Sequence, residues 1–462
     1  MAEDLVAHDS PTSKAGERFF LFIGSTTSDA AVSKLKTAGI FYHHKMLESG
    51  VENWKTIIDF LEAPGLLGVI AKLTSRNFEL VVQPEYEPVA VQLFQALAAT
   101  EHLLFIHESI LSGRNDWDGS NPPDWNGEQP PPFDFRKHRF GPPSEKTRVR
   151  ILGYLNEYDV NVVPYNTNAE LAVLASAFVE DNENNLLFRI YVPTGRIYAT
   201  EADKLLSLFR EWLTKVKNFH IREDGYSTGR GQVYEFFGDE GISTAALAEQ
   251  FDDFSQFLDR CVGSPEEAVA SLTAMGINER SATDIVRRYG KETTRLQLDI
   301  RHAREAKMLS IQHRLESELV DVLNGENVDV GELVEGLVPN VQSPAIAIGL
   351  SSVGGSTDQD RPIVINQQII GSVEGIVAQE LHGTAQLGIE AEELIKLIDK
   401  FGDREVSALQ SAVYELEDED ARPADRLGAK QQVKAFLYGL VGKVEERALV
   451  ALQSYVESKI GL

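Results

Sequence analysis

The stretch RFFLFIGSTTSDAAVSKLKTAG, residues 18–39, decides the fold class of the first part of the chain. Residues 18–24 are a short continuous apolar run that a glycine ends, which is typical of a buried strand. A helical pattern follows, with Ser28 as the candidate N-cap and Gly39 as the stop signal. A buried strand followed by a helix is the repeating unit of α/β domains with a largely parallel sheet.

The same alternation continues downstream. Residues 78–84 (FELVVQP) and 102–109 (HLLFIHES) are predicted to be strands, with a helix over residues 89–99 between them. We therefore expect an α/β domain over residues 18–111.

A segment rich in Pro, Gly, Asn and Asp, residues 112–144, interrupts this pattern. Proline fixes its own backbone and removes a hydrogen-bond donor, so regular structure is not expected there. The segment also holds Trp117, Trp125, Phe133 and Phe135. Aromatic residues are unusual in a solvated linker, so two interpretations stay open: a linker draped over a domain surface, or a lid over a pocket.

Hairpins replace the strand–helix alternation from residue 145 onward. Residues 148–155 (RVRILGYL) and 160–165 are predicted strands, and residues 186–200 are predicted to be two strands around a Pro-Thr-Gly turn. Two more strands flank the loop DGYSTGRG, residues 224–231. Because strands outnumber helices, this part is predicted to be α+β.

Helices are predicted from residue 244 onward, and Ser264 with Pro265 and Glu267 forms a helix start with a capping box. Residues 265–290, with their Met-Gly-Ile turn, resemble the small helical ubiquitin-associated type of module. That resemblance implies a peptide-binding or packing role, and plain linker helices are the alternative.

A long helical pattern over residues 287–324 predicts a single helix or a coiled-coil stalk. Between residues 287 and 314 it carries eight Lys and Arg against three acids, a local charge of +5. Arg301 and Arg304 are its candidate contacts to nucleic-acid phosphates. The alternative is that the basic helix pairs with acidic surfaces of its own chain.

The last part of the chain combines short apolar runs, regularly placed glycines and a helical bundle over residues 390–460. The glycine-punctuated pattern is carried by Ile369, Gly371, Val373, Gly375 and Gly383. This arrangement resembles the tail of bacterial abortive-infection and other phage-defence proteins. The resemblance implies self-association and an antiviral defence or stress role, and a short β ladder has edges that a second copy can pair.

Composition limits the remaining possibilities. The 462 residues include 44 Lys and Arg against 71 Asp and Glu, a net charge of −27, which argues against nonspecific binding of DNA or anionic membrane by the whole surface. The single cysteine, Cys261, follows an apolar helical stripe and is interpreted as a core residue rather than a nucleophile. No signal-like start and no apolar run of membrane length occurs, which predicts a cytoplasmic protein with no membrane partner.

Polar residues follow two of the predicted strands. Ser25, Thr26 and Asp29 follow the first strand, and His107 with Glu108 ends a later one. Carboxyl ends of parallel strands meet at one edge of an open sheet, where ligand sites lie. We therefore predict a ligand-binding edge there, with His107 and Glu108 as catalytic candidates. The edge resembles that of Toll/interleukin-receptor-type domains, which implies action on nucleotides, either NAD-like or cyclic.

Two further groups were weighed as sites. Ser227, Thr228 and Arg230 offer hydroxyls and a cation to a phosphate, and the alternative is a flexible hairpin loop. His43 and His44 are adjacent on a predicted strand, so they point to opposite faces and no metal site is expected. No motif identifies a cofactor.

The sequence thus predicts a multi-domain α/β and α+β protein with a helical connector and a C-terminal short β ladder plus helical bundle. The predicted parts are a disordered tail (1–17), an α/β domain (18–111), a linker or lid (112–144), an α+β domain (145–240), a helical connector (241–335) and a self-association tail (336–462). Three functions are hypothesised. They are a homo-oligomeric bacterial defence or stress protein with a nucleotide or protein trigger, an enzyme acting on nucleotides, and a nucleic-acid-binding regulator.

Overall fold

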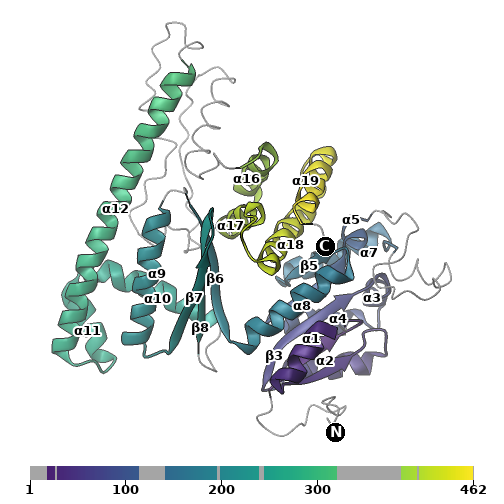
Figure 1. Ribbon diagram of the computed structural model, residues 1–462. Coiled ribbons are helices and arrows are strands. Elements are labelled where there is room, and N and C mark those ends of the chain that lie inside the picture. The colour runs from purple at the N-terminus through teal and green to yellow at the C-terminus, as the bar shows by residue number, and fades with distance from the viewer. Residues whose placement is uncertain are drawn as a thin grey trace. The chain divides into compact units, whose positions relative to one another are not determined.

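The structure is a computed structural model that describes residues 18–26, 29–113, 141–194, 198–238, 244–319, 387–402 and 405–460. The chain divides into two compact units (Figure 1). The first unit combines Met1–Asn184 with Arg422–Leu462, and the second is Asn185–Ala421. A mixed α/β and α+β multi-domain fold is confirmed. Within the described ranges, no helix is both long enough and apolar enough to cross a membrane.

The first unit is built on a parallel five-stranded sheet in the order β2-β1-β3-β4-β5. Its strands are β1 (Phe19–Ile23), β2 (Phe41–Lys45), β3 (Leu66–Leu73), β4 (His102–His107) and β5 (Val162–Tyr165). The strand order reverses between β1 and β3, which makes the carboxyl ends of these two strands the topological switch point. Ligands of open α/β sheets bind outside such a point.

Helices cover both faces of this sheet (Figure 1). All five residues of β1 are buried, because alternate side chains enter the two layers of core. One layer, around Phe20, Phe22 and Phe105, packs against α1 (Asp29–Ala38) and α8 (Asn168–Glu183). The other layer packs against α2 (Val51–Leu61), α3 (Ser75–Val81), α4 (Glu87–Ala98) and α7 (Glu145–Glu157).

The strand predicted over residues 78–84 is wrong, since Ser75–Val81 is helix α3. Thr74 accepts a hydrogen bond from the backbone N–H of Asn77, and the Asn77 side chain accepts one from the Thr74 N–H. This reciprocal cap starts a helix where the apolar run alone resembled a strand. The strand of this region is β3 (Leu66–Leu73), which ends before the predicted one begins, and the sequence prediction missed it.

The predicted domain boundary at residue 145 is also corrected. Residues 148–155 belong to helix α7, which Ser144 caps by accepting from the N–H of Thr147. The strand predicted over residues 160–165 exists as β5, but it pairs in parallel with β4 and so completes the first sheet. Residues up to Asn184 therefore belong to the first unit.

The second unit holds an antiparallel sheet in the order β6-β8-β7 and a set of helices. They are β6 (Leu186–Pro193), α9 (Ala199–Lys215), β7 (Ile221–Ser227), β8 (Gly231–Gly238), α10 (Thr244–Gly263), α11 (Pro265–Ala274), α12 (Glu279–Leu319), α16 (Ile389–Phe401) and α17 (Val406–Glu417). Phe209 and Trp212 of α9 pack with Phe254 of α10 and Phe236 of β8 in one core.

Two local predictions in this unit need correction. The second strand expected before residue 200 does not reach that residue, because Ala199 begins helix α9, and residues 195–197 lie outside the described residues. Ser264 does precede α11 and Pro265 is its first residue, but the Ser264 side chain makes no capping hydrogen bond. The long helix is confirmed as α12, 41 residues long, and its coiled-coil pairing stays a prediction.

The predicted C-terminal bundle is divided between the units. Helices α16 and α17 belong to the second unit, whereas α18 (Pro423–Gly439) and α19 (Glu446–Ser458) belong to the first. Leu427 of α18 is fully buried in the same core as Phe20 and Phe22. The glycine-punctuated segment lies outside the described residues, as does most of residues 112–144, so self-association stays a prediction.

His102 joins the beginnings of β4 and β5. Its Nδ1–H donates to the Thr100 carbonyl oxygen at 2.9 Å, and its Nε2 accepts from the Asn161 backbone N–H at 2.8 Å. The bond that Nε2 accepts requires the neutral ring, and burial lowers the pKa of His102 below its ordinary value of 6.5. Below about pH 6.5 the unfolded chain therefore binds a proton that the folded chain does not, so the free energy of unfolding falls as the pH falls towards the folded-state pKa.

We expect a His102→Gln variant to lose this part of the pH dependence. The measurement is urea unfolding of both chains between about pH 5 and pH 7.5, a range that brackets the ordinary histidine pKa. His220, in the second unit, supplies the matched His220→Gln control. Parallel profiles for wild type and His102→Gln would contradict the assignment.

Candidate functional site

The loop after β1 makes a tight turn at the switch point. Gly24 has a φ of 80°, and a Cβ there would lie 2.6 Å from the Lys72 carbonyl oxygen, so only glycine fits. The Gly24 N–H donates to the Lys45 carbonyl oxygen at 2.8 Å. His44 Nε2 lies 2.7 Å from the Gly24 carbonyl oxygen, which only accepts, so the proton of this ring is on Nε2. The end of β2 and the end of β3 thus hold the loop from both sides.

Two hydroxyls follow this glycine, and neither has a hydrogen-bond partner among the residues that the structure describes. Ser25 Oγ and Thr26 Oγ1 are both buried, and Thr26 as a residue is 1% exposed. A buried polar group without a partner costs about 1–3 kcal/mol, so such groups in native proteins usually have a ligand or an ordered water as partner. The sequence predicted both residues as ligand-binding, and the structure places both at the carboxyl edge.

The helix that follows β3 contributes a third buried hydrogen-bond donor. Asn77, in the first turn of α3, is 2% exposed, and its Oδ1 is used in the cap with Thr74. Its Nδ2 has no hydrogen-bond partner within the described ranges. Thr74 Oγ1 also lies 3.4 Å from Glu48 Oε1. Asn77 was not predicted as a site residue, because residues 78–84 were taken for a strand.

A buried cation and two rings lie on the α1–α8 face near the same edge. Lys72 of β3 is 2% exposed, and its Nζ is 4.8 Å from the centre of the Tyr165 ring. The ring of His107, at the end of β4, meets the Tyr165 ring edge to face with centroids 5.3 Å apart. Lys72 was missed as well, although a lysine inside the apolar run LLGVIAKL is a signal that could have found it.

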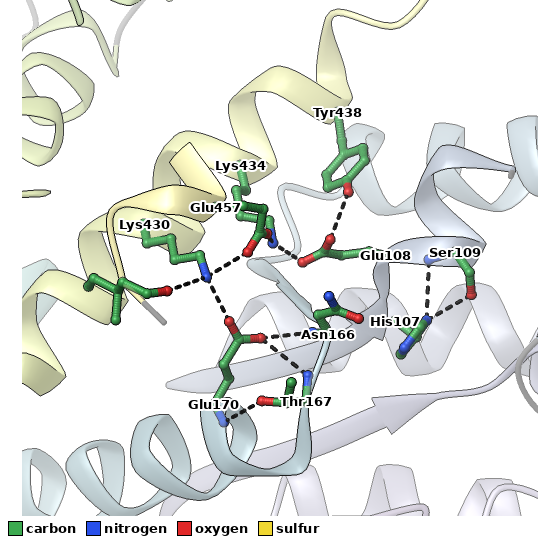
Figure 2. A network of polar contacts seen from close by, with 11 residues as sticks. His107, Glu108, Ser109, Asn166, Thr167, Glu170, Lys430, Lys434, Tyr438 and Glu457 are labelled. Atoms are coloured by element: carbon green, nitrogen blue, oxygen red, sulfur yellow. Dashed lines mark hydrogen bonds and ion pairs between the residues drawn. The ribbon is translucent and has the colours of Figure 1, made fainter. Parts of the chain in front are cut away.

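His107 also caps the short helix α5 (Glu108–Ser112). Its Nδ1 accepts from the backbone N–H of Ser109 at 3.2 Å, and the Ser109 hydroxyl lies 2.7 Å from the same nitrogen (Figure 2). Nδ1 is therefore the acceptor nitrogen, and the proton of the neutral ring is on Nε2. The geometry explains why the strand ends here, and it gives His107 a structural role.

The C-terminal helices add a buried ion network to the ends of β4 and β5 (Figure 2). Lys434 of α18 pairs with Glu108 and with Glu457 of α19. Lys430, one turn earlier, pairs with Glu170 at 2.9 Å and with Glu457 at 2.7 Å. The Lys430 and Lys434 side chains are 2% and 1% exposed, so both ammonium groups depend on these carboxylates.

The same carboxylates shape the local structure of the edge. Glu170 forms the capping box of α8 with Thr167, and it also accepts from the Asn166 N–H at 2.8 Å. Burial lowers the pKa of Lys434. Burial works against the charge of Glu457 as well, but the two lysines outweigh it and lower the pKa of that carboxyl. Glu108, predicted as catalytic, is thus a member of an ion network that holds α18.

The predicted phosphate-binding loop of residues 227–230 contacts other residues of the second unit. Thr228 Oγ1 contacts Asp418, which follows α17, and Arg230 Nη1 donates to the Glu417 carbonyl oxygen at 2.8 Å. Ser227 Oγ donates to Gln232 across the hairpin. These groups fix the end of α17 against the hairpin, so the loop is a packing element rather than an open phosphate site.

The remaining predicted residues lie apart from this edge or carry other roles. Asp29 is the first residue of α1. His43 and His44 point to opposite faces of β2, His43 towards Phe60 and His44 towards Gly24. Among the described residues no three His, Cys, Asp or Glu side chains gather as metal ligands.

The basic helix and the cysteine belong to the second unit. Arg301 and Arg304 lie on α12, and Arg301 is exposed. Three other basic residues of α12 pair with acids of the same unit, Arg287 with Asp284, Arg288 with Glu211 and Arg295 with Glu292. Cys261 is buried in the core, and burial raises its pKa to about 12, which keeps the thiol protonated.

No protein-family model, no curated protein and no solved structure matches this chain, so its function has to be argued from the groups at the sheet edge.

Proposed function

We propose that the first unit binds a small phosphate-bearing ligand, of the nucleotide class, at the carboxyl edge of its parallel sheet. The observation that carries this proposal is the pair of buried hydroxyls without partners, Ser25 Oγ and Thr26 Oγ1, directly after β1 at the switch point. A phosphate oxygen accepts from two adjacent hydroxyl donors and removes the cost of leaving them unpaired.

The surroundings favour an anion over a neutral ligand. The buried Lys72 ammonium is on β3, the neighbour of β1 across the switch point. Helix α1 begins three residues after Thr26, and the amino end of a helix carries partial positive charge. Asn77 Nδ2 supplies a further buried donor after β3. A hydroxyl pair beside the amino end of a helix suits a phosphate group better than an apolar molecule. Lys72 and Asn77 lie near the same edge on opposite faces of the sheet, Lys72 on the α1–α8 face and Asn77 on the α3 face.

Catalysis is not part of this proposal. His107 Nδ1 is used in capping α5, and Glu108 is engaged by Lys434. That the protein is a hydrolase or transferase acting on nucleotides stays a separate hypothesis. It can be tested with the ligand that is found to bind.

The Thr26→Val substitution tests the proposal, because it removes the hydroxyl and keeps the shape. We expect the ligand-free variant to be more stable than the wild type by about 1–3 kcal/mol, the cost of an unpaired buried group. We also expect it to lose the stabilisation that phosphate or ATP gives the wild type. Hydrogen exchange of the β1 amides reports stability of this unit, and thermal unfolding with phosphate, ATP and NAD reports binding.

Thr37→Val is the matched control. Thr37 lies near the end of α1, is exposed, and its hydroxyl donates to the Ser33 carbonyl oxygen at 2.9 Å. It should leave the response to ligand unchanged. A wild type that none of the three compounds stabilises, or a Thr26→Val variant that responds as the wild type does, would refute the proposal.

A further inference from the structure

An open groove of about 980 Å³ lies between α10, α11 and α12 of the second unit. Its apolar lining comes from Cys261, Val262, Pro265, Val269, Ala270 and Val286. Val262 is 41% exposed, so part of this apolar lining faces solvent. The groove is therefore a concave apolar surface that is open to a partner.

Close packing of two helices shapes the groove. A Cβ at Gly290 would lie 2.9 Å from the Cys261 carbonyl oxygen, so α12 approaches the end of α10 as only glycine permits. Pro265 then starts α11 after a single intervening residue, Ser264. The groove is bounded by fixed helices rather than by loops, and its shape does not need to be formed on binding.

The α12 wall of the groove is cationic over its Arg287–Lys291 part, and Glu279 lines the same wall two turns earlier. Arg287 and Lys291 both line it and are four residues apart, so they lie on the same side of α12. The Arg287 side chain is 75% exposed, and its contact is Asp284 of its own helix at 3.4 Å. Arg288, by contrast, is held by Glu211 of α9 at 2.6 Å. In a chain with a net charge of −27, a basic wall beside an apolar floor is a distinct recognition surface.

We propose that this groove binds an amphipathic helix of a partner protein, with its apolar stripe on Val262 and Val269 and acidic side chains beside Arg287 and Lys291. Cations one helical turn apart match carboxylates at positions i and i+4 of an opposing helix. Glu266 lines the other side of the groove, so the second flank of the partner helix is neutral or basic. The asymmetry of the walls fixes the direction in which the partner lies.

Two labelled peptides of about five helical turns test the proposal. Both have the same leucine stripe, but one flank carries glutamates in the first peptide and lysines in the second. We expect the full-length protein to bind the glutamate peptide more tightly, with an affinity that falls as salt is raised. The double variant Arg287→Glu/Lys291→Glu should bind that peptide at least about tenfold more weakly and should now prefer the lysine peptide.

Two single variants complete the design. Val262→Asp places a charge on the exposed floor and should weaken both peptides. Arg301→Glu makes the same charge change elsewhere on α12, outside the groove, and should leave both affinities unchanged. Circular dichroism and thermal unfolding confirm that the variants fold, which their exposure predicts.

Three results would overturn the proposal. They are equal binding of the two peptides, unchanged preference after the double charge reversal, and equal loss of binding with Arg301→Glu. Light scattering tests whether a second copy of the chain occupies the groove. A wild-type dimer that the double charge reversal dissociates would show that it does, and that the occupant is not another protein.

Discussion

A chain that ends at Ala421 is expected to lose the stable fold of its first unit, although the deleted residues follow the sheet by more than two hundred positions. The deletion removes α18 and α19. Leu427 is fully buried with Phe20, Phe22 and Tyr165, so this core would be opened to water. It also removes the lysine partners of Glu108 and Glu170. Losses of this kind add to several kcal/mol, which is a large share of the roughly 5–15 kcal/mol that stabilises a domain.

Hydrogen exchange of the β4 and β5 amides is the measurement, since these strands lie next to the deleted helices. Their protection should fall towards that of an unfolded chain, while β6 and β8 of the second unit stay protected. A separate polypeptide of residues 422–462 should restore part of the protection when it is added in excess. If the truncated chain keeps wild-type protection in β4 and β5, residues 422–462 do not stabilise the first sheet, which is what a separate tail over residues 336–462 would imply.

Elements that are marked by a short apolar run or by a glycine stop in their own sequence were predicted correctly. The apolar run of β1, the helix that Gly39 ends and the strand His102–His107 appear where they were expected. Residues 78–84 misled because a short apolar run of four to eight residues suits both a strand and a buried helix. There the cap between Thr74 and Asn77 decided the outcome.

Partners that are distant in sequence were beyond local reasoning. Nothing in residues 160–165 says that they pair with β4 rather than with a later hairpin, because parallel pairing leaves no turn signal. The same limit applies to α18, whose apolar pattern predicts a buried face but not the unit that buries it.

The candidate site was predicted in part. Ser25 and Thr26 were found because residues after the first strand of an open sheet lie at its carboxyl edge. Lys72 and Asn77 were missed together with β3 and α3. The lysines of α18 had a readable signal, since Lys430 and Lys434 follow Leu427 at helical spacing and so lie on its buried face.

The Lys434→Met substitution is expected to lower the free energy of unfolding of the first unit by about 3–5 kcal/mol. Lys434 is 1% exposed as a side chain, and it stands between Glu108 and Glu457. Methionine fills a similar volume, so packing is largely kept. The loss arises because Glu108 stays largely buried without its cation, whereas Glu457 keeps its pair with Lys430.

Lys443→Met, the same change at an exposed position after α18, is the control and should alter stability by no more than about 0.5 kcal/mol. The double variant Lys434→Met/Glu108→Gln removes the charge that Lys434→Met leaves without a cation and keeps Glu457 for Lys430, and we expect it to recover most of the loss. Urea unfolding followed by exchange of the β4 amides compares the four chains. If Lys434→Met equals Lys443→Met, the network lies in water and contributes little. If the double variant is no better than Lys434→Met, the loss comes from packing, and charge does not join α18 to the sheet edge.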